Sequence, residues 1–301
     1  MKILIAGGTG LIGSALTHSF IQNNDQITLI SRTPDRINSG LNAIPWDIDR
    51  ISQEIESMDI VINLAGASIA GSSPLSMRWT NQRKSLIRSS RIQSGKIILK
   101  AIQKSTHKPE VLIQASAIGY YGSRGNQPAN ENTPHGVDFL ADVCQGWEES
   151  TSGVEELGVR RIISRLGLVL SREGGLLPLL SLPYKFYLGG PLGKGQQSMS
   201  WIHIEDVVRS YHYFINERST QGVYNLTAPI PVNNKAFSSS LGRSLNRPSW
   251  LAIPAGAVNL LLGEASTLAI DGREVLPQRL LESGFEFLFK NIDSALDDLI
   301  H

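Results

Sequence analysis

A glycine-rich turn near the start of the chain constrains the fold more than any other feature. Residues 2–6 suit a buried parallel strand, and Gly7, Gly10 and Gly13 follow at regular spacing. Gly7 permits a tight turn, Gly10 lets backbone approach a pyrophosphate, and Gly13 lets a helix pack closely on the strand. The pattern predicts a strand, a turn and a helix whose free N–H groups face phosphates. We expect cofactor contacts from Gly7, Thr9, Gly10, Leu11, Ile12 and Gly13.

Composition narrows the class of protein. The 301 residues carry 28 basic and 27 acidic side chains, so their formal net charge of +1 gives no general attraction to nucleic acid or anionic membrane. Cys144 is the only cysteine, which excludes an internal disulfide and fits a reducing cytoplasm. No apolar run reaches the length of about 18 residues that a membrane span needs. The scattered histidines imply no metal. We expect a cytoplasmic protein with a small-molecule substrate.

Strand patterns alternate with helical patterns along most of the chain. This alternation predicts an α/β fold of the Rossmann type, a doubly wound parallel sheet with helices on both faces. We expect strands at 2–6, 26–30, 43–47, 59–64, 111–115, 159–166 and 223–226. We expect helices at 11–22, 51–57, 80–104, 138–157, 204–215, 234–245, 254–262 and 277–282.

The residues after the second expected strand indicate which dinucleotide is bound. A site for NAD normally has a carboxylate there, which accepts from the ribose 2′-OH. This chain has Ser31, Arg32 and Thr33 instead, and a guanidinium with two hydroxyls suits a 2′-phosphate. NADP is therefore the expected cofactor. The alternative is that Arg32 is a solvated loop arginine.

Further contacts are expected after the third and fourth strands. Asp47 either accepts from the adenine amino group or caps a turn. Leu64, Ala65 and Gly66 follow the fourth strand and are small or apolar, so the backbone there can pass close to the cofactor and contact it. The alternative is a plain turn between strand and loop, which has the same pattern. Arg83 and Lys84 lie near the start of a long basic helix. We single them out as candidates to contact the cofactor or an anionic substrate. We interpret most of its other basic residues as a solvated face: Arg88, Arg91, Lys96, Lys100 and Lys104.

The chain changes character after about residue 170, where glycine and proline become frequent. We therefore expect an NADP-binding Rossmann domain at 1–170, with its sheet completed by about 200–228. Residues 171–200 and 229–301 would form a smaller, mainly helical C-terminal region that covers the substrate. The loop-rich segment 189–197 and Trp201 offer a pocket wall on which Lys194 is the only charge.

The whole chain resembles the extended short-chain dehydrogenase/reductase superfamily. Within it, the chain is similar to the NAD(P)-dependent nucleoside-diphosphate-sugar epimerase-like family whose members carry a C-terminal domain of unknown function. The segments that carry this resemblance are 7–13, 64–67, 116–122, 165–170, 193–203, 225–229 and 284–285. The resemblance implies a Rossmann domain, NADP binding, and a substrate pocket between that domain and the C-terminal part.

One departure from the superfamily bears on catalysis. Its members transfer a proton with a Tyr-x-x-x-Lys pair, while a serine polarises the substrate carbonyl. Ser116 stands in the serine position and would also contact the cofactor. Glu148 aligns with the glutamate that follows the lysine, which puts Leu140 at the tyrosine position and Cys144 at the lysine position. Neither side chain can perform the proton transfer.

Other side chains are candidates for that chemistry. Tyr120 and Tyr121 follow Ser116 on a loop that would face the nicotinamide, and either they supply a phenol or they only pack. Arg165 ends the sixth strand at the edge of the sheet where such folds bind ligands, so we expect it in the pocket. His203 either contacts substrate and shuttles a proton, or is a structural histidine at a helix start.

Two functions stay open at this stage. One is an oxidoreductase or epimerase of atypical mechanism, acting with NADP on a small carbonyl or nucleotide-sugar substrate. The other is a catalytically inactive NADP-binding sensor or regulatory protein, which the loss of the Tyr-x-x-x-Lys pair favours. The apolar positions of the long helix pack either on the sheet or on a partner helix in a homodimer: Leu86, Ile87, Ile97, Ile98 and Ile102.

Overall fold

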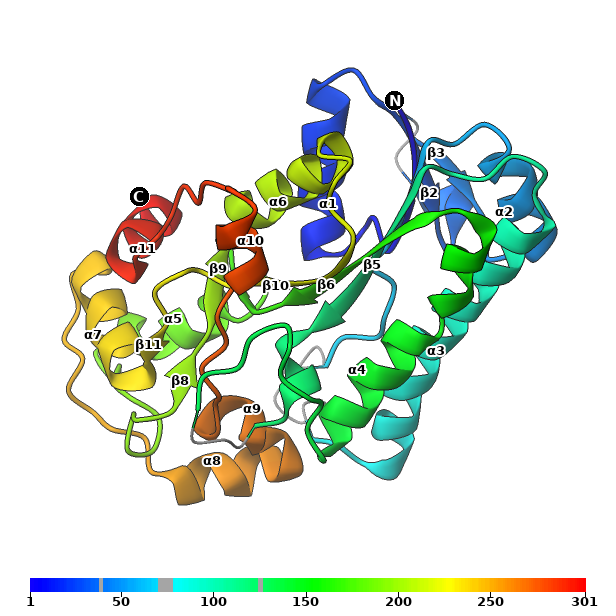
Figure 1. The fold of residues 1–301 in the computed structure, drawn as a ribbon. Coiled ribbons are helices and arrows are strands. Elements are labelled where there is room, and N and C mark those ends of the chain that lie inside the picture. Colours follow the sequence, from blue (N-terminus) through cyan, green and yellow to red (C-terminus); the bar gives the residue numbers. More distant parts are fainter. Residues whose placement is uncertain (38–39, 70–77, 124–126) are drawn as a thin grey trace.

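A seven-stranded parallel sheet forms the centre of the molecule (Figure 1). The computed structural model describes residues 1–37, 40–69, 78–123 and 127–301. The strand order is β10-β6-β5-β4-β1-β2-β3, and every pairing in this sheet is parallel. The strands are β1 (Lys2–Ala6), β2 (Gln26–Ile30), β3 (Asn42–Ile44), β4 (Ile60–Asn63), β5 (Val111–Ala117), β6 (Arg160–Leu166) and β10 (Gly222–Leu226). The predicted Rossmann-type sheet is confirmed.

The strand order reverses between β1 and β4, because the chain first builds outward through β2 and β3 and then returns to β4. Such a switch point leaves a crevice at the carboxyl ends of the strands, where open α/β sheets bind ligands. β3 is shorter than the predicted strand 43–47. Pro45 follows its last residue and has no N–H to donate to the ladder, so pairing ends there.

Helices cover both faces of the sheet. α1 (Leu11–Gln22) and α6 (Ile204–Asn216) pack against one another on one face, where Leu16, Phe20 and Phe214 join the core. α2 (Ile48–Ile55), α3 (Asn81–Lys104) and α4 (Phe139–Glu149) lie side by side on the other face (Figure 1). The predicted helix 138–157 is divided into α4 and the 3-10 helix η4 (Ser152–Leu157).

The apolar stripe of α3 faces its own sheet. Ile87, Ile98 and Ile102 are completely buried within the chain, whereas Leu86 is 49% exposed. Of the two alternatives that the sequence left open, packing on the sheet therefore accounts for these three isoleucines.

A second hydrophobic core holds the C-terminal region together. It joins α5 (Leu177–Lys185), α7 (Asn234–Ser244) and α11 (Ile292–Ile300) through side chains such as Tyr184, Phe237 and Leu296. Two small sheets border it: β7 (Leu168–Leu170) pairs with β9 (Trp201–His203), and β8 (Ser198–Met199) pairs with β11 (Val232–Asn233). The sequence predicted neither α5, which contains Pro178 and Pro183, nor α11.

Three short α-helices and one 3-10 helix complete the described part of the C-terminal region. α8 (Ala255–Leu262) leads through the 3-10 helix η5 (Gly263–Ser266) into α9 (Thr267–Ile270), and α10 (Gln278–Glu282) lies against β10. Arg78 near the start of α3 donates hydrogen bonds to the carbonyls of Leu260 and Leu261, which ties α8 to the sheet domain. Within the described residues, no helix is both long enough and apolar enough to cross a membrane.

Candidate functional site

The glycine turn between β1 and α1 is shaped by close backbone contacts. Gly7 has a φ of +82°, and a Cβ there would lie 2.9 Å from the carbonyl carbon of Leu64 at the end of β4. A Cβ on Gly13 would lie 2.2 Å from the carbonyl oxygen of Gly7, so only glycine lets α1 approach the strand this closely. The turn therefore lies directly at the β1–β4 switch point.

The N-terminus of α1 is open for an anion. Gly10 is the N-cap residue, and no side chain caps the helix. The N–H groups of the first helical turn precede the first intrahelical bond, which Ser14 donates to the carbonyl of Gly10. Thr9 and Gly10 are exposed, while Leu11 and Ile12 are half-buried. Free N–H groups and the positive end of the helix dipole together fit a pyrophosphate.

The end of β2 presents the residues from which the sequence predicts NADP rather than NAD. Ser31 Oγ accepts a hydrogen bond from the N–H of Thr33 at 3.1 Å, which folds this segment into a tight turn. Arg32 is exposed beside it. Asp47 is also exposed, and its carboxylate accepts from the N–H of Arg50 at 2.9 Å as the N-cap of α2. Of the two alternatives for Asp47, the structure thus contains the contact that capping requires.

A buried amide pair supports the loop after β4. Asn63 donates to Gln114 Oε1 at 2.8 Å, and its own Oδ1 accepts from the N–H of Ala65 at 3.2 Å. Both amides are fully buried between β4 and β5. The backbone of Leu64, Ala65 and Gly66 is thereby fixed at the switch point, next to the glycine turn.

The basic residues at the start of α3 contact protein groups. Arg83 donates to the carbonyl of Ser68, and Lys84 forms an ion pair with Glu264. One of the basic residues interpreted as solvated is not so: Arg91 is only 8% exposed. It lies four residues after Ile87 and seven before Ile98, so the apolar spacing of α3 was a signal for its burial.

A buried network lies at the carboxyl ends of the other strands. Ser116 Oγ donates to Glu148 Oε1 at 2.6 Å, and Arg165 donates to both oxygens of Glu148 at 2.8 Å. Arg165 also donates to the hydroxyl of Tyr121 at 2.9 Å, which in turn donates to Asn225 Oδ1 at 2.7 Å. We call these five residues the Glu148 network.

The sheet itself aligns three members of this network. Ser116 on β5 and Asn225 on β10 are both register partners of Arg165 on β6. Glu148 reaches them from the last turn of α4. Burial alone would lower the pKa of Arg165, but the hydrogen bonds and charge of Glu148 outweigh it and raise that pKa. The predicted pocket residue Arg165 is 3% exposed and is engaged in this ion pair.

The two tyrosines of the predicted catalytic loop lie in different surroundings. Tyr121 is 1% exposed, and burial raises its pKa to about 12. Tyr120 is half-buried, and the guanidinium carbon of Arg165 lies 3.3 Å from the centre of its ring. Both come from the 3-10 helix η3 (Ile118–Tyr121). Tyr121 is thus held inside the Glu148 network, whereas Tyr120 covers it.

Leu140 and Cys144 occupy the face of α4 that meets this loop. A Cβ placed on Gly119 would lie 3.3 Å from Leu140 Cβ and 3.7 Å from Cys144 Sγ. Burial and the charge of Glu148 raise the pKa of Cys144 to about 12, so its thiol is neutral. The part of α4 that the resemblance aligns with the superfamily's tyrosine and lysine therefore contains an alkyl group and a buried thiol.

Trp201 and His203 lie inside the protein. Trp201 is completely buried in the core of the C-terminal region. His203 is 3% exposed and stacks on Phe289, and its Nδ1 accepts from the N–H of Glu205 as the N-cap of α6. Burial lowers the pKa of His203 to about 4, although Asp298 lies 3.3 Å away. These contacts match the structural interpretation of His203.

An open pocket lies between the sheet domain and the C-terminal region. Its volume is about 460 Å³, and its charged lining residues are Lys194 and Asp271. Ser123, two residues beyond Tyr121, also lines it, together with Gln196 and Gln197. The sequence indicated the wall that contains Lys194. It gave no signal for Asp271, which reaches the pocket from the segment after α9.

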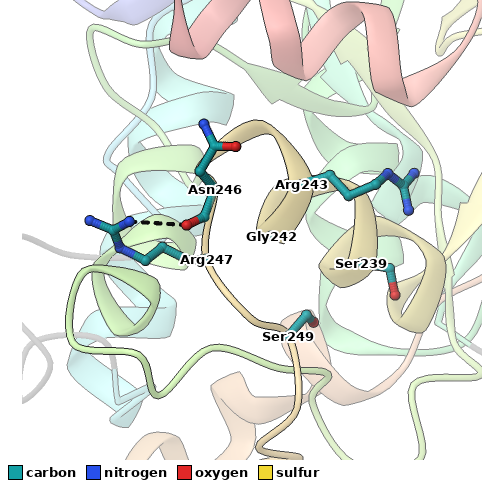
Figure 2. A pocket seen from close by; sticks show the side chains of 6 residues that line it. All are labelled: Ser239, Gly242, Arg243, Asn246, Arg247 and Ser249. Atoms are coloured by element: carbon teal, nitrogen blue, oxygen red, sulfur yellow. Dashed lines mark hydrogen bonds between the residues drawn. The ribbon is translucent and has the colours of Figure 1, made fainter.

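A larger pocket of about 660 Å³ lies at the carboxyl end of α7 (Figure 2). Its two arginines already have partners within the chain. Arg243 pairs with Asp293 on α11 at 2.6 Å, and Arg247 donates to the carbonyl of Asn246 and stacks on Tyr187. This pocket includes no residue from the carboxyl ends of the sheet strands, so it is separate from the predicted site.

Comparisons with known proteins agree with this architecture. Residues 3–143 match the model of the NAD dependent epimerase/dehydratase family, and residues 253–299 match a domain of unknown function, DUF1731. An epimerase family protein of Staphylococcus saprophyticus is 42% identical over 303 residues, which cover 99% of each chain.

Solved structures are similar over the full chain. The human epimerase family protein SDR39U1, crystallised with NADPH, is 30% identical with a TM-score of 0.90, covering 100% of this chain and 99% of that one. A nucleoside-diphosphate sugar epimerase from Corynebacterium glutamicum is 28% identical with a TM-score of 0.80, covering 100% of this chain and 58% of that one.

Proposed function

Since the chain belongs to the epimerase family proteins of the extended short-chain dehydrogenase/reductase superfamily, we propose that it is an NADP-dependent oxidoreductase or epimerase acting on a small carbonyl or nucleotide-sugar substrate. The observation that carries the proposal is the uncapped N-terminus of α1 at the switch point of the sheet. This is the arrangement by which Rossmann folds hold a pyrophosphate.

The choice of NADP rests on the end of β2. Arg32 is exposed there between two hydroxyl-bearing residues, Ser31 and Thr33, where a site for NAD has a carboxylate. A guanidinium forms charge-assisted hydrogen bonds with a phosphate, whereas a carboxylate would repel it. NADPH bound to the similar human protein supports the same choice.

The bound nicotinamide would accept or supply a hydride, and the chain's own residues would orient the substrate and move a proton. Ser116 lies at the carboxyl end of β5, where its hydroxyl donates to Glu148. Tyr121 has its hydroxyl engaged with Arg165 and Asn225, so Tyr120 is the tyrosine that we assign to proton transfer. The guanidinium of Arg165 beneath the ring would stabilise a developing phenolate.

We place the substrate in the pocket of about 460 Å³ beside Ser123. This pocket offers hydroxyl, amide, ammonium and carboxylate groups, which suit a small polyhydroxylated substrate. It adjoins η3 through Ser123, so a bound carbonyl would lie near Tyr120 rather than near the separate pocket at α7.

Cofactor binding is the first test of this function. We expect the wild-type protein to bind NADPH more tightly than NADH, and Arg32→Asp to abolish that preference, because a carboxylate repels the 2′-phosphate and accepts from a 2′-OH. Titration of NADPH and NADH fluorescence measures both affinities. Arg36→Asp on the same exposed loop is a matched control that should keep the preference. Equal affinity of the wild type for both cofactors would contradict the assignment.

Turnover is the second test. The protein, loaded with NADP or NADPH, is incubated with small carbonyl compounds and nucleotide sugars, and the products are followed by absorbance and mass spectrometry. We expect turnover that falls about a hundredfold or more in Tyr120→Phe, the range of general acid–base catalysis. Bound cofactor without turnover on any substrate would instead support the second candidate, an NADP-binding sensor. Leu140 and Cys144 on the face of α4 favour that candidate.

A homodimer stays a proposal within this function. Leu86 is the exposed apolar residue on the predicted face of α3, and a partner helix would cover it. Sedimentation velocity of the pure protein separates monomer from dimer, and Leu86→Glu should shift a dimer toward monomer.

A further inference from the structure

Arg91 is a buried cation at the cofactor end of the sheet. It lies near the middle of α3, on the face that packs on the sheet domain, and its Nη1 donates to the carbonyls of Ala67 and Ile87, both at 3.0 Å. Its guanidinium also lies 5.0 Å from the ring of Trp147 on α4. The side chain of Arg91 therefore extends from α3 into the space between α4 and the loop after β4.

The loop after β4 leaves room for this guanidinium. A Cβ on Gly66 would lie 3.0 Å from the Cζ of Arg91 and 3.2 Å from its Nε. Gly66 is exposed, so the guanidinium lies just below the surface at the switch point. Arg91 keeps 8% of its surface exposed, so its side chain is not sealed from solvent.

The charge of Arg91 is not balanced by the protein residues that the structure describes. The ion pairs among residues 1–37, 40–69, 78–123 and 127–301 do not include Arg91, and its Nε and Nη2 donate to none of these residues. Burial lowers the pKa of Arg91, which reflects the cost of this uncompensated charge. A buried charge without a partner is expensive, and an anionic or hydroxyl-bearing ligand would reduce that cost.

The topology indicates which part of a dinucleotide reaches Arg91. The pyrophosphate belongs at the N-terminus of α1, and the adenine ribose belongs at the end of β2. The remaining half of the cofactor must then extend over β4 and β5, on the other side of the switch point. Arg91 lies under the β4 loop, and Cys144, at the superfamily's lysine position, is close enough for the charge of Arg91 to oppose the rise in the pKa of its thiol.

We propose that Arg91 supplies the cation that the superfamily's lysine otherwise provides, and that it holds the nicotinamide ribose and adjoining phosphate of the cofactor through Nε and Nη2. This assignment rests on the proposed function, since it requires NADP binding. Arg91 thereby compensates for Cys144 at the lysine position of α4. It is a binding and positioning residue, because its hydrogen bonds would fix the nicotinamide half relative to Ser116 and Tyr120.

The test uses two probes that share the adenine half. NADPH contains the nicotinamide ribose, whereas adenosine 2′,5′-bisphosphate ends before it. We expect Arg91→Gln to weaken NADPH binding by about tenfold or more, the loss of hydrogen bonds from a charged donor. The same variant should bind adenosine 2′,5′-bisphosphate within about twofold of wild type. Calorimetric titration measures both affinities.

Two further variants complete the experiment. Arg88→Gln removes an exposed cation one turn earlier on α3 and should leave both affinities unchanged. Arg91→Lys keeps the charge with fewer donors, so NADPH binding should weaken by less than in Arg91→Gln, to about threefold. This conservative variant also carries the test if Arg91→Gln does not fold.

The outcomes separate the inference from the proposed function. A wild-type protein that binds neither probe overturns the proposed function itself. A wild-type protein that binds NADPH, with both Arg91 variants equally tight, overturns only the role of Arg91. Equal weakening of both probes by Arg91→Gln or Arg91→Lys also overturns it, because a purely structural defect would act on the adenine half as well.

Discussion

The two ends of the cofactor crevice are built in different ways. At β1 and β4 the site consists of backbone: a positive-φ glycine, a helix that approaches within contact distance of the turn, and free N–H groups. At β5, β6 and β10 the site consists of side chains, the Glu148 network, whose members come from five separate elements. The first end is local in the sequence, and the second depends on long-range pairing.

This difference teaches what each end can tolerate. A backbone site is disturbed only where a new Cβ meets other backbone, so its sensitive positions are the glycines. A buried charged network is disturbed by the loss of any one partner, because the remaining charge stays in the protein interior. The stability of the fold should therefore depend most strongly on the network, and cofactor binding on the turn.

The largest expected effect comes from breaking the network at its centre. Glu148→Gln leaves the guanidinium of Arg165 buried without a counter-charge, and we expect the free energy of unfolding to fall by about 3–5 kcal/mol. Urea denaturation of the cofactor-free protein measures this change. The neighbouring Glu149 is exposed, so Glu149→Gln is a matched control that should stay within about 0.5 kcal/mol of wild type. Similar stabilities for the two variants would show that the network contributes little.

A second substitution breaks the backbone end. Gly13→Ala forces a Cβ to within 2.2 Å of the carbonyl oxygen of Gly7. The helix must move away from the turn, so we expect a loss of about 3 kcal/mol in the free energy of unfolding together with loss of NADPH binding. Gly256→Ala in α8 has no atom within 4 Å of the new Cβ and serves as control, with unchanged binding. Normal NADPH affinity in Gly13→Ala would contradict the assignment of the phosphate site.

The contrast between a local turn and a long-range network also explains which parts of the site could be predicted from the sequence. The glycine turn and the alternating strands predicted the sheet because both signals are local. The resemblance to the superfamily predicted that Leu140 and Cys144 replace a catalytic pair. It did not indicate that Glu148, which served only to align that helix, forms the centre of a buried network. Arg165 was expected in the pocket because it ends a strand, and nothing local indicates that α4 provides its counter-charge.

Missed elements have physical reasons as well. Pro178 and Pro183 led us to interpret the segment of α5 as loop, yet Pro178 lies in the first turn, where its missing N–H costs nothing. For α11 a signal existed: Asn291 caps the helix, and Ile292, Ala295 and Leu296 have helical spacing. Arg91 was interpreted as solvated from its charge, although its position within the apolar stripe of α3 indicated burial.

A pH titration extends the comparison to His203, a buried cap at the start of α6. Burial lowers its pKa to about 4 in the folded protein, below the unfolded value of about 6.5. The unfolded chain therefore binds more protons between these values, and stability falls as pH falls from about 6.5 to 4. We expect a loss of about 2 kcal/mol from this group by pH 4.5. His203→Asn keeps an N-cap without a titrating group, so its stability should change less with pH. If the free energy of unfolding changes with pH equally in both proteins, His203 is not the cause of that pH dependence.

The smallest expected effect concerns Asp47, where the sequence left a cap and an adenine contact equally open. As N-cap of α2 its carboxylate accepts from the N–H of Arg50, so Asp47→Ala should cost about 1 kcal/mol of stability. Asp47→Ser keeps a capping oxygen on a shorter side chain and should restore most of that loss. Because the capping bond already engages the carboxylate, we expect NADPH affinity within about twofold of wild type in both variants. A serine variant that is as stable as wild type but binds NADPH more weakly would assign Asp47 to the adenine instead, and would add a second side-chain contact, beside Arg32, at the adenine end of the crevice.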